Sequence, residues 1–266
     1  MRLDKYLAEA AIGTRKVVRN YVKNGLVMVN DETILEPASI IDETKDVIIY
    51  KNRRVISEGR VYYMFHKPAG CITARKDDNA KTVLEYFHQI DTGGLFPVGR
   101  LDKDTEGLLF FTNDGEFDHR LMDPESHVPK TYFFWAMGEL NSEKKDKLEK
   151  GICISEEEPL TLPAKVKQVQ SGFFSELESE LEKDMDKKIV LKKNAGEQAM
   201  FSGYLTITEG RKHQVKRMLK AVGCHVLYLK RVAVGPVTLD ENLKRGQYRS
   251  LTKEEIDILE NAEGQM

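Results

Sequence analysis

Residues 99–109 read GRLDKDTEGLL and concentrate charged side chains in a turn directly before an apolar run. Carboxylates placed in this way can act as general bases or nucleophiles, and they can equally cap the amides of a turn. A calcium loop is not favoured, because its sixth position is Gly107 but its twelfth is Asn113 instead of a bidentate Glu. Taken alone, these residues leave a catalytic site and a structural turn equally open.

A second polar segment, residues 209–218, reads EGRKHQVKRM and leads into helical spacing of apolar side chains. Residues 205–231 hold seven basic side chains and one acidic side chain, a net charge of +6. A local patch of this kind favours contact with phosphate groups. The whole chain has 41 Lys and Arg against 43 Asp and Glu, so a uniformly basic nucleic-acid coat is excluded and any basic site is local.

Two short helices are expected at the amino-terminal end. Apolar side chains from Leu3 to Ala10 follow helical spacing, which predicts a first helix ending near Ile12. Thr14 is a suitable N-cap for a second helix, and Gly25 is a suitable residue to end it. The second helix carries a basic stripe made of Arg15, Lys16, Arg19 and Lys23. Such a stripe can be an ordinary solvated face, or it can follow a phosphate backbone.

Charge is segregated along this part of the chain, with a net charge of +4 in residues 1–30 and of −5 in residues 31–50. A hairpin with a turn at Asn30-Asp31 follows the basic helix. Residues 1–50 resemble the alpha-L RNA-binding module, which is named after a small-subunit ribosomal protein and begins RLDKYLAEA. The resemblance implies that the module contacts structured RNA. Asp31 stands where the module usually has Gly, so a turn with positive φ at both central residues is energetically less favourable here.

A length of 266 residues corresponds to about two domains. We expect a helix-helix-hairpin module in residues 1–55 and a second domain in residues 60–266. Predicted strands in the second domain cover residues 61–66, 108–112, 131–137 and 204–208, and a helix covers residues 212–222, which indicates an α+β domain. Residues 171–200 contain seven acidic and five basic side chains. They are predicted to be an insertion, either a charged helical hairpin or a mobile excursion.

Read together, the segments resemble the pseudouridine synthases. The resemblance rests on GRLDKDTEGLL at residues 99–109, KTY at residues 130–132 and EGRKHQVKRM at residues 209–218. More narrowly, the chain resembles the ribosomal small subunit pseudouridine synthase A family, with further likeness in the amino-terminal module and in residues 147–165 and 246–252. The resemblance implies a mainly antiparallel catalytic sheet and the conversion of one uridine of 16S ribosomal RNA to its carbon-linked isomer, without metal or organic cofactor.

The resemblance also implies roles for individual side chains. Asp102 matches the family's essential carboxylate, and Lys216 matches the basic residue that pairs with it. A cation is needed there because a charged carboxylate in a partly dry pocket is unfavourable alone. Arg100 matches a residue implied in extruding the uridine, since a guanidinium can stack on bases and bind phosphate. Tyr132 matches an aromatic residue that stacks on the extruded uracil, although a strand tyrosine outside such a motif is more often in the core.

Further substrate contacts follow from the same resemblance. His213 and Gln214 match positions that support the loop and the substrate through hydrogen bonds, and Arg211 belongs to the same basic segment. Leu251 is predicted to provide an apolar floor to the site. His66 stands where the family usually has Asn, so the resemblance does not imply a polar substrate contact from that turn.

Composition excludes several other classes. No apolar run approaches the roughly 18 residues of a membrane span, and the amino-terminal residues do not form a signal peptide, so a cytoplasmic location is expected. Cys71, Cys153 and Cys224 are far apart and form no C-x-x-C pair, which argues against a disulfide framework and a zinc site. The expected form is a monomer that binds ribosomal RNA.

Three alternatives to this function remain open at the level of the sequence. A sister enzyme acting on 23S ribosomal RNA would share the same three segments. A ribosome-assembly factor could use the scaffold only to bind RNA, although the joint presence of Asp102, Tyr132 and Lys216 speaks against this. A glycosidase using Asp102 and Asp104 as a carboxylate pair has no support from the RNA-binding module and would release sugar.

Overall fold

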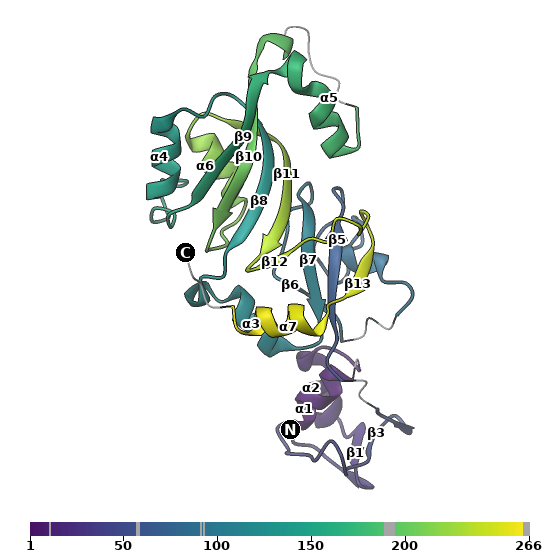
Figure 1. Cartoon of the computed structure of the whole chain (residues 1–266). Coiled ribbons are helices and arrows are strands. Elements are labelled where there is room, and N and C mark those ends of the chain that lie inside the picture. Colours follow the sequence, from purple (N-terminus) through teal and green to yellow (C-terminus); the bar gives the residue numbers. More distant parts are fainter. Residues whose placement is uncertain (11, 57–58, 91, 93, 189–194, 263–266) are drawn as a thin grey trace.

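The structure, a computed structural model, describes residues 1–10, 12–56, 59–90, 92, 94–188 and 195–262. Within these ranges the strands form a four-stranded sheet near the amino terminus and a nine-stranded sheet in the remainder of the chain (Figure 1). Helices lie against the sheets without the regular alternation of an α/β fold. The predicted α+β class is therefore confirmed.

The amino-terminal unit combines two helices with the small sheet. Its elements are α1 (Leu3–Glu9), α2 (Arg15–Lys23), β1 (Val27–Val29), β2 (Glu32–Thr33), β3 (Ile48–Tyr50) and β4 (Arg53–Arg54), with the strand order β2-β1-β3-β4. The predicted end of the first helix near Ile12 was wrong, because the Ile12 amide donates to the Leu7 carbonyl (3.1 Å) and closes the helix after Glu9. Thr14 caps α2 as predicted, accepting from the Val17 amide (3.4 Å).

The hairpin between β1 and β2 keeps its two-residue turn despite the missing glycine. Asn30 and Asp31 have φ values of 49° and 68°, which is the left-handed conformation that such a turn needs. The Asn30 side chain is held on both sides, donating to the Asp46 carboxylate (2.8 Å) and accepting from the Val47 amide (2.9 Å). These bonds to the next strand offset the strain at the turn.

The large sheet has the strand order β13-β5-β7-β11-β8-β10-β9, with β6 beside β7 and β12 beside β11. The strands are β5 (Tyr62–Lys67), β6 (Phe96–Val98), β7 (Glu106–Thr112), β8 (Lys130–Met137), β9 (Lys165–Phe173), β10 (Ala199–Ile207), β11 (His225–Val234), β12 (Val237–Thr238) and β13 (Tyr248–Ser250). Among the described strands every pairing is antiparallel except that of β7 with β11. The expectation of a mainly antiparallel sheet is confirmed.

The parallel contact between β7 and β11 joins two halves of this sheet. It is short, pairing Glu106 with Lys230 and Gly107 with Arg231. Gly107 has a φ of 106°, and a Cβ atom there would lie 2.1 Å from the Arg231 carbonyl oxygen. Only glycine permits this approach. The start of β7, and the charged turn that precedes it, are thereby fixed against β11.

Helices cover both faces of the sheet. They are α3 (Gly115–Met122), α4 (Ser142–Lys150), α5 (Phe174–Met185), α6 (Gln214–Ala221) and α7 (Lys253–Glu260), with short 3-10 turns η1 (Val83–Tyr86), η2 (Pro124–Ser126) and η3 (Ala195–Glu197). Helices α4 and α6 lie on one face of β8, β10 and β11, whereas α3 and α7 lie at the end of the sheet nearest the amino-terminal unit (Figure 1).

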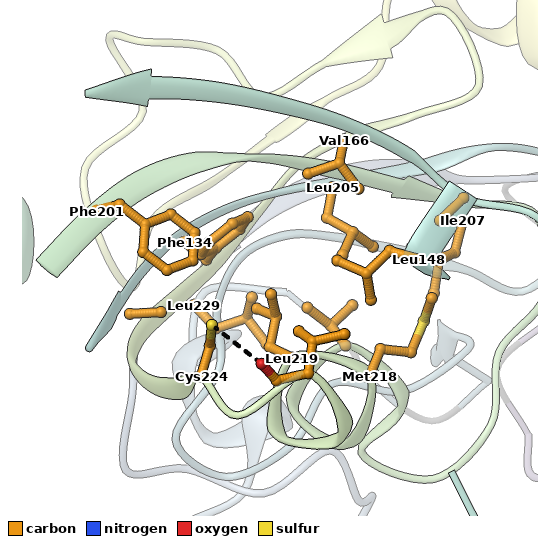
Figure 2. Close-up of a cluster of buried hydrophobic side chains, with 14 residues drawn as sticks. Phe134, Leu148, Val166, Phe201, Leu205, Ile207, Met218, Leu219, Cys224 and Leu229 are labelled. Carbon is orange, nitrogen blue, oxygen red and sulfur yellow. Dashed lines mark hydrogen bonds between the residues drawn. The ribbon is translucent and has the colours of Figure 1, made fainter. Parts of the chain in front are cut away.

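The core beneath α4 and α6 is an apolar layer that holds α6 in place. Phe134 of β8, Leu205 of β10 and Leu219 of α6 are fully buried in it, together with Leu148 of α4 (Figure 2). Truncating one such leucine to alanine typically costs about 2–5 kcal/mol. Because this layer fixes the backbone of α6, it also fixes the positions from which the exposed side chains of α6 extend.

The predicted insertion is represented by α5, which packs on the opposite face of the sheet. Leu181 is fully buried there against Trp135, whose indole donates to the Asp184 carboxylate (2.7 Å). Arg245 donates to the Asp184 carbonyl and to the Glu106 carboxylate (2.8 Å). The helix is therefore docked on the sheet, and residues 189–194 of the predicted excursion lie outside the described residues.

Polar contacts join the amino-terminal unit to the large sheet. Lys5 forms an ion pair with Glu116 (2.6 Å), and the Asn113 amide donates to the Glu9 carbonyl (2.7 Å). Burial raises the pKa of the Glu9 carboxyl, with Arg60 partly offsetting the effect. Among the described residues, no helix is long and apolar enough to cross a membrane.

Candidate active site

A cavity of about 740 Å³ opens beside the junction of β7 and β11. Its walls come from the turn before β7, the start of β8, the loop before α6 and the middle of β11. This volume lies in the usual range for small-ligand sites, and the walls mix apolar and charged groups. The cavity is large enough for one nucleoside.

Asp102 and Lys216 meet at this cavity although they are 114 positions apart in the sequence. The Lys216 ammonium lies 3.3 Å from the Asp102 carboxylate. Both side chains are about one quarter exposed, at 25% and 26% for Lys216 and Asp102 respectively. The predicted ion pair is therefore present in the structure, and solvent or a substrate can reach it from the cavity.

The Lys216 ammonium is shared with a second carboxylate, that of Asp104. This contact is shorter, at 2.5 Å, although the Asp104 side chain is 74% exposed. Burial alone would raise the pKa of Asp104, but the hydrogen bond and the charge of Lys216 outweigh it and lower that pKa. Lys216 thus bridges two carboxylates on one turn.

His213 approaches Asp102 from the other side. Its Nε2 atom lies 3.5 Å from the Asp102 carboxylate, an ion pair only when the imidazole is protonated. The residue has a φ of 53° and directly precedes α6, so its left-handed backbone turns the chain from the loop into the helix. His213 is half-exposed, which leaves its ring accessible from the cavity.

The backbone of the Asp102 turn is held by a buried lysine that the sequence did not reveal. Lys67 is fully buried, and its ammonium donates to the carbonyls of Asp102 (3.0 Å), Thr105 (2.9 Å) and Pro68 (3.1 Å). Burial lowers the pKa of Lys67, and nearby acidic groups work against this. On the other side of the turn, Thr73 donates to the Leu101 carbonyl (2.8 Å). The signal that could have found Lys67 is a lone lysine at the end of an apolar strand.

Tyr132 and Lys130 line the cavity from β8. Tyr132 is partly buried and packs between the two large apolar clusters of the sheet. Lys130 is buried, and its ammonium donates to the carbonyls of Val128 (2.9 Å) and Leu121 (3.3 Å). Burial, reinforced by the charge of Arg231, lowers the pKa of Lys130 to about 8. This shifted lysine was not predicted from the sequence.

Gln214 and Arg211 hold the loop before α6, and both line the cavity. Gln214 donates to the Glu209 carboxylate (2.7 Å) and accepts from the Arg211 amide (2.9 Å). The Arg211 guanidinium is bound to Glu209 (2.9 Å) and to the carbonyls of Pro159 and Leu160. In this arrangement the guanidinium fixes the loop, because its hydrogen bonds go to other groups of the protein.

Two other predicted residues occupy different surroundings. Arg100 lines the cavity and is exposed, and it forms no ion pair with any described residue. Leu251 does not line the cavity; it is 6% exposed and packs in the cluster that includes Met64, Leu108 and Leu259. Leu251 directly follows β13 and packs into this core, so the structure does not bring it to the predicted floor of the site. His66 is buried away from the cavity and bonds to the Leu243 carbonyl (2.7 Å).

The basic stripe of α2 lies in the amino-terminal unit, away from the cavity lining. Its four members, Arg15, Lys16, Arg19 and Lys23, are all exposed. Arg19 and Arg15 also approach the buried Asp4 carboxylate, at 2.8 and 3.5 Å. Burial would raise the pKa of Asp4, but its arginine neighbours lower it overall. Lys16 and Lys23 form no ion pair within the described part of the chain.

Comparison with known proteins agrees with this arrangement. Residues 61–221 match the family model described as RNA pseudouridylate synthase, and residues 1–48 match the S4 domain. An uncharacterized RNA pseudouridine synthase of Bacillus subtilis is 38% identical over 97% of this chain and 98% of its own length. The ribosomal small subunit pseudouridine synthase A of Vibrio cholerae is 36% identical, and that of Escherichia coli K12 is 33% identical, each over 96% of this chain and 98% of the relative.

A solved structure shares both the sequence and the fold. A crystal structure of a pseudouridylate synthase covers 97% of this chain and 99% of its own, at 32% identity and a TM-score of 0.62. Pseudouridine synthases bind RNA and are isomerases. The chain is therefore a member of the RNA pseudouridylate synthase family, an isomerase with an S4 domain at its amino-terminal end.

Proposed function

We propose that this enzyme converts one uridine of 16S ribosomal RNA to pseudouridine, with Asp102 as the essential carboxylate. The observation that carries the proposal is the Asp102–Lys216 ion pair, 3.3 Å long, at the edge of a nucleoside-sized cavity. Small-subunit RNA is favoured because the Vibrio and Escherichia relatives named for that substrate align over almost the whole chain.

The reaction begins with extrusion of the uridine from the folded RNA. Arg100 is exposed beside the cavity and has no described anionic partner, so its guanidinium is free to brace the gap and bind phosphate. The extruded uracil then enters the cavity against Tyr132, whose ring provides a stacking surface.

Asp102 acts on the bound nucleoside as a nucleophile on the sugar or the base, or as a base that removes a ribose proton. The N1–C1′ bond breaks, the uracil rotates, and a C5–C1′ bond forms; the proton leaves C5 and N1 gains one. Lys216 places a positive charge 3.3 Å from the Asp102 carboxylate, and the His213 ring lies 3.5 Å from its other oxygen. The isomerisation is redox neutral, and the proposal includes no cofactor or metal.

The amino-terminal unit serves to capture the RNA. We propose that residues 1–55 and 60–266 are separate domains, and that Arg15, Lys16, Arg19 and Lys23 of the first domain bind phosphate groups. The chain works as a cytoplasmic monomer in this proposal. Arg211 and Gln214 contribute by fixing the loop over the substrate, and Leu251 by supporting the core behind β13.

The test is to incubate the purified protein with deproteinised 16S and 23S RNA and to map pseudouridines in both. We expect one new pseudouridine, in 16S RNA only. The Asp102→Asn variant keeps the shape of the side chain and should form none while binding the RNA with nearly unchanged affinity. A modification confined to 23S RNA would reassign the substrate, and full turnover by Asp102→Asn would reject the catalytic role.

A further inference from the structure

A second hollow, of about 520 Å³, lies directly beside the cavity described above. The two share Thr73, Gly99, Arg100 and Met122 in their walls. The second hollow extends away from Asp102, towards the side of the molecule that carries α3 and the end of β6. A nucleic-acid strand that places one nucleotide in the first cavity can therefore place an adjacent nucleotide over the second.

The walls of this hollow combine apolar surface with one carboxylate. Pro97 of β6 and Met122 of α3 supply apolar surface, and Asp118 lies one helical turn before Met122 on the same side of α3. Proline rings and methionine thioethers provide flat or adaptable contacts for a planar base. Arg75 closes another part of the wall and is held by the carbonyls of Thr92 (3.1 Å) and Leu95 (2.5 Å).

The backbone at Gly99 makes this geometry possible. Gly99 has a φ of 69°, and a Cβ atom there would lie 2.3 Å from the Met122 sulfur. The turn can therefore run close against α3 and present Arg100 between the two hollows. Arg100 is exposed and pairs with no described carboxylate, so it is positioned to bind the phosphate that links two adjacent nucleotides.

Asp118 is a wall carboxylate without an ion pair in the described part of the chain. It is partly buried, and its carboxylate interacts with the backbone of Gly99. Burial raises the pKa of Asp118, and the Gly99 amide and the nearby His119 offset only part of this effect. A partly buried carboxylate facing an open hollow is stabilised by a donor that a ligand brings.

We infer that this hollow is a subsite for a nucleotide that flanks the target uridine, and that Asp118 selects a base with an exocyclic amino group there. An ionised carboxylate accepts hydrogen bonds and donates none. The amino groups of adenine, cytosine and guanine are donors, whereas uracil presents two carbonyl oxygens around a single N–H and is repelled. The inference rests on the proposed isomerase function, because it takes the first cavity as the position of the target uridine.

The experiment uses the full-length protein and short RNA fragments around the mapped target uridine. Each fragment carries one of the four bases immediately before or immediately after that uridine. We expect kcat/KM to be about tenfold higher for an amino-bearing base than for uracil at one of these two positions, as one hydrogen bond to a charged group predicts. Removing the amine alone, by replacing guanine with inosine or adenine with purine, should cause the same loss.

Asp118→Ala should abolish this discrimination, giving equal kcat/KM for paired fragments with and without the amine. Asp118→Asn keeps the shape of the side chain and should also reduce the discrimination. This second variant keeps the test valid if the alanine variant folds poorly. Glu125→Ala removes an exposed carboxylate of η2 and should leave it unchanged. Two results would overturn the subsite without affecting the isomerase function. One is a kcat/KM that does not depend on either flanking base; the other is a fall in kcat/KM on removal of the amino group that is as large in Asp118→Ala as in the wild type. A wild-type protein that isomerises no uridine in any RNA would overturn both.

Discussion

The ammonium of Lys67 lies 3.0 Å from the carbonyl oxygen of Asp102, inside the protein. The same ammonium reaches the Thr105 carbonyl at 2.9 Å. Burying a positive charge costs desolvation free energy. Hydrogen bonds to the backbone carbonyls offset this cost. The geometry of the candidate catalytic turn is thus fixed in part by a buried residue that does not line the cavity.

Replacing Lys67 by Met tests this role. Methionine fills a similar volume but leaves the carbonyls of the turn without a donor, so we expect the unfolding free energy to fall by about 2–4 kcal/mol. The turn should also loosen, and kcat should drop at least tenfold with a smaller change in KM. Chemical denaturation and steady-state kinetics measure the two effects. Wild-type kcat in a folded Lys67→Met protein would show that the turn needs no such support.

Lys216 contacts two carboxylates, and the two contacts are expected to differ in importance. Asp104 is mostly exposed, so Asp104→Asn should change stability by no more than about 0.5 kcal/mol, as for surface ion pairs. Its kcat should stay within a few-fold of wild type, because Lys216 remains beside Asp102. Lys216→Met should lower kcat by about a hundredfold or more, since the charge beside Asp102 is lost. Equal losses in both variants would mean that Asp104 shares the chemistry.

The sequence predicted the meeting of Asp102 and Lys216 because both belong to recognisable segments. It missed Lys67 and Lys130, since a buried lysine satisfied by carbonyls leaves no partner side chain to recognise in the sequence. Leu251 was expected at the site, but its side chain enters the core just after β13. The partners that hold it there, such as Met64 and Leu108, lie far away in the sequence, so local pattern could not reveal them. The fold class followed from periodicity, whereas the parallel β7–β11 junction depends on one glycine contact.

The lowered pKa of Lys130 predicts a specific dependence of stability on pH. Its folded-state pKa is about 8, below the usual value of 10.5 for lysine, so the unfolded chain binds more protons between these two values. The contribution of Lys130 to stability should therefore be least favourable below pH 8. It should improve as the pH rises towards 10.5, by up to about 3 kcal/mol.

Comparison with Lys130→Met isolates this effect from other groups that titrate at high pH. The unfolding free energy of the wild type minus that of the variant, measured from pH 7 to pH 10.5, should rise with pH. A difference that stays constant across this range would contradict the shifted pKa. Cavity-lining Lys130 should also react with amine reagents at lower pH than surface lysines do.

Lys16 and Lys23 of α2 test the proposed RNA capture, because both are exposed and form no described ion pair. Replacing each by Gln should weaken binding to 16S RNA and reduce the slope of log affinity against log salt by about 0.7–0.9 per lost phosphate contact. Turnover of a short RNA fragment should change little. Lys45→Gln removes an exposed lysine from the acidic segment and serves as the control. An unchanged salt slope in the Lys16→Gln, Lys23→Gln double variant would exclude this face from RNA binding.

The junction between the S4 domain and the large sheet depends on Asn113, which donates to the Glu9 carbonyl at 2.7 Å and accepts from the Val61 amide at 2.9 Å. Asn113→Ala leaves these buried backbone groups unpaired, so we expect a loss of about 1–3 kcal/mol in stability. A looser junction lowers the effective concentration of the S4 domain at the RNA beside the cavity. KM for full-length 16S RNA should therefore rise several-fold, whereas KM for a fragment too short to reach the S4 domain should not. An equal rise for both substrates would place the effect of Asn113 in the cavity itself and not in the orientation of the two units.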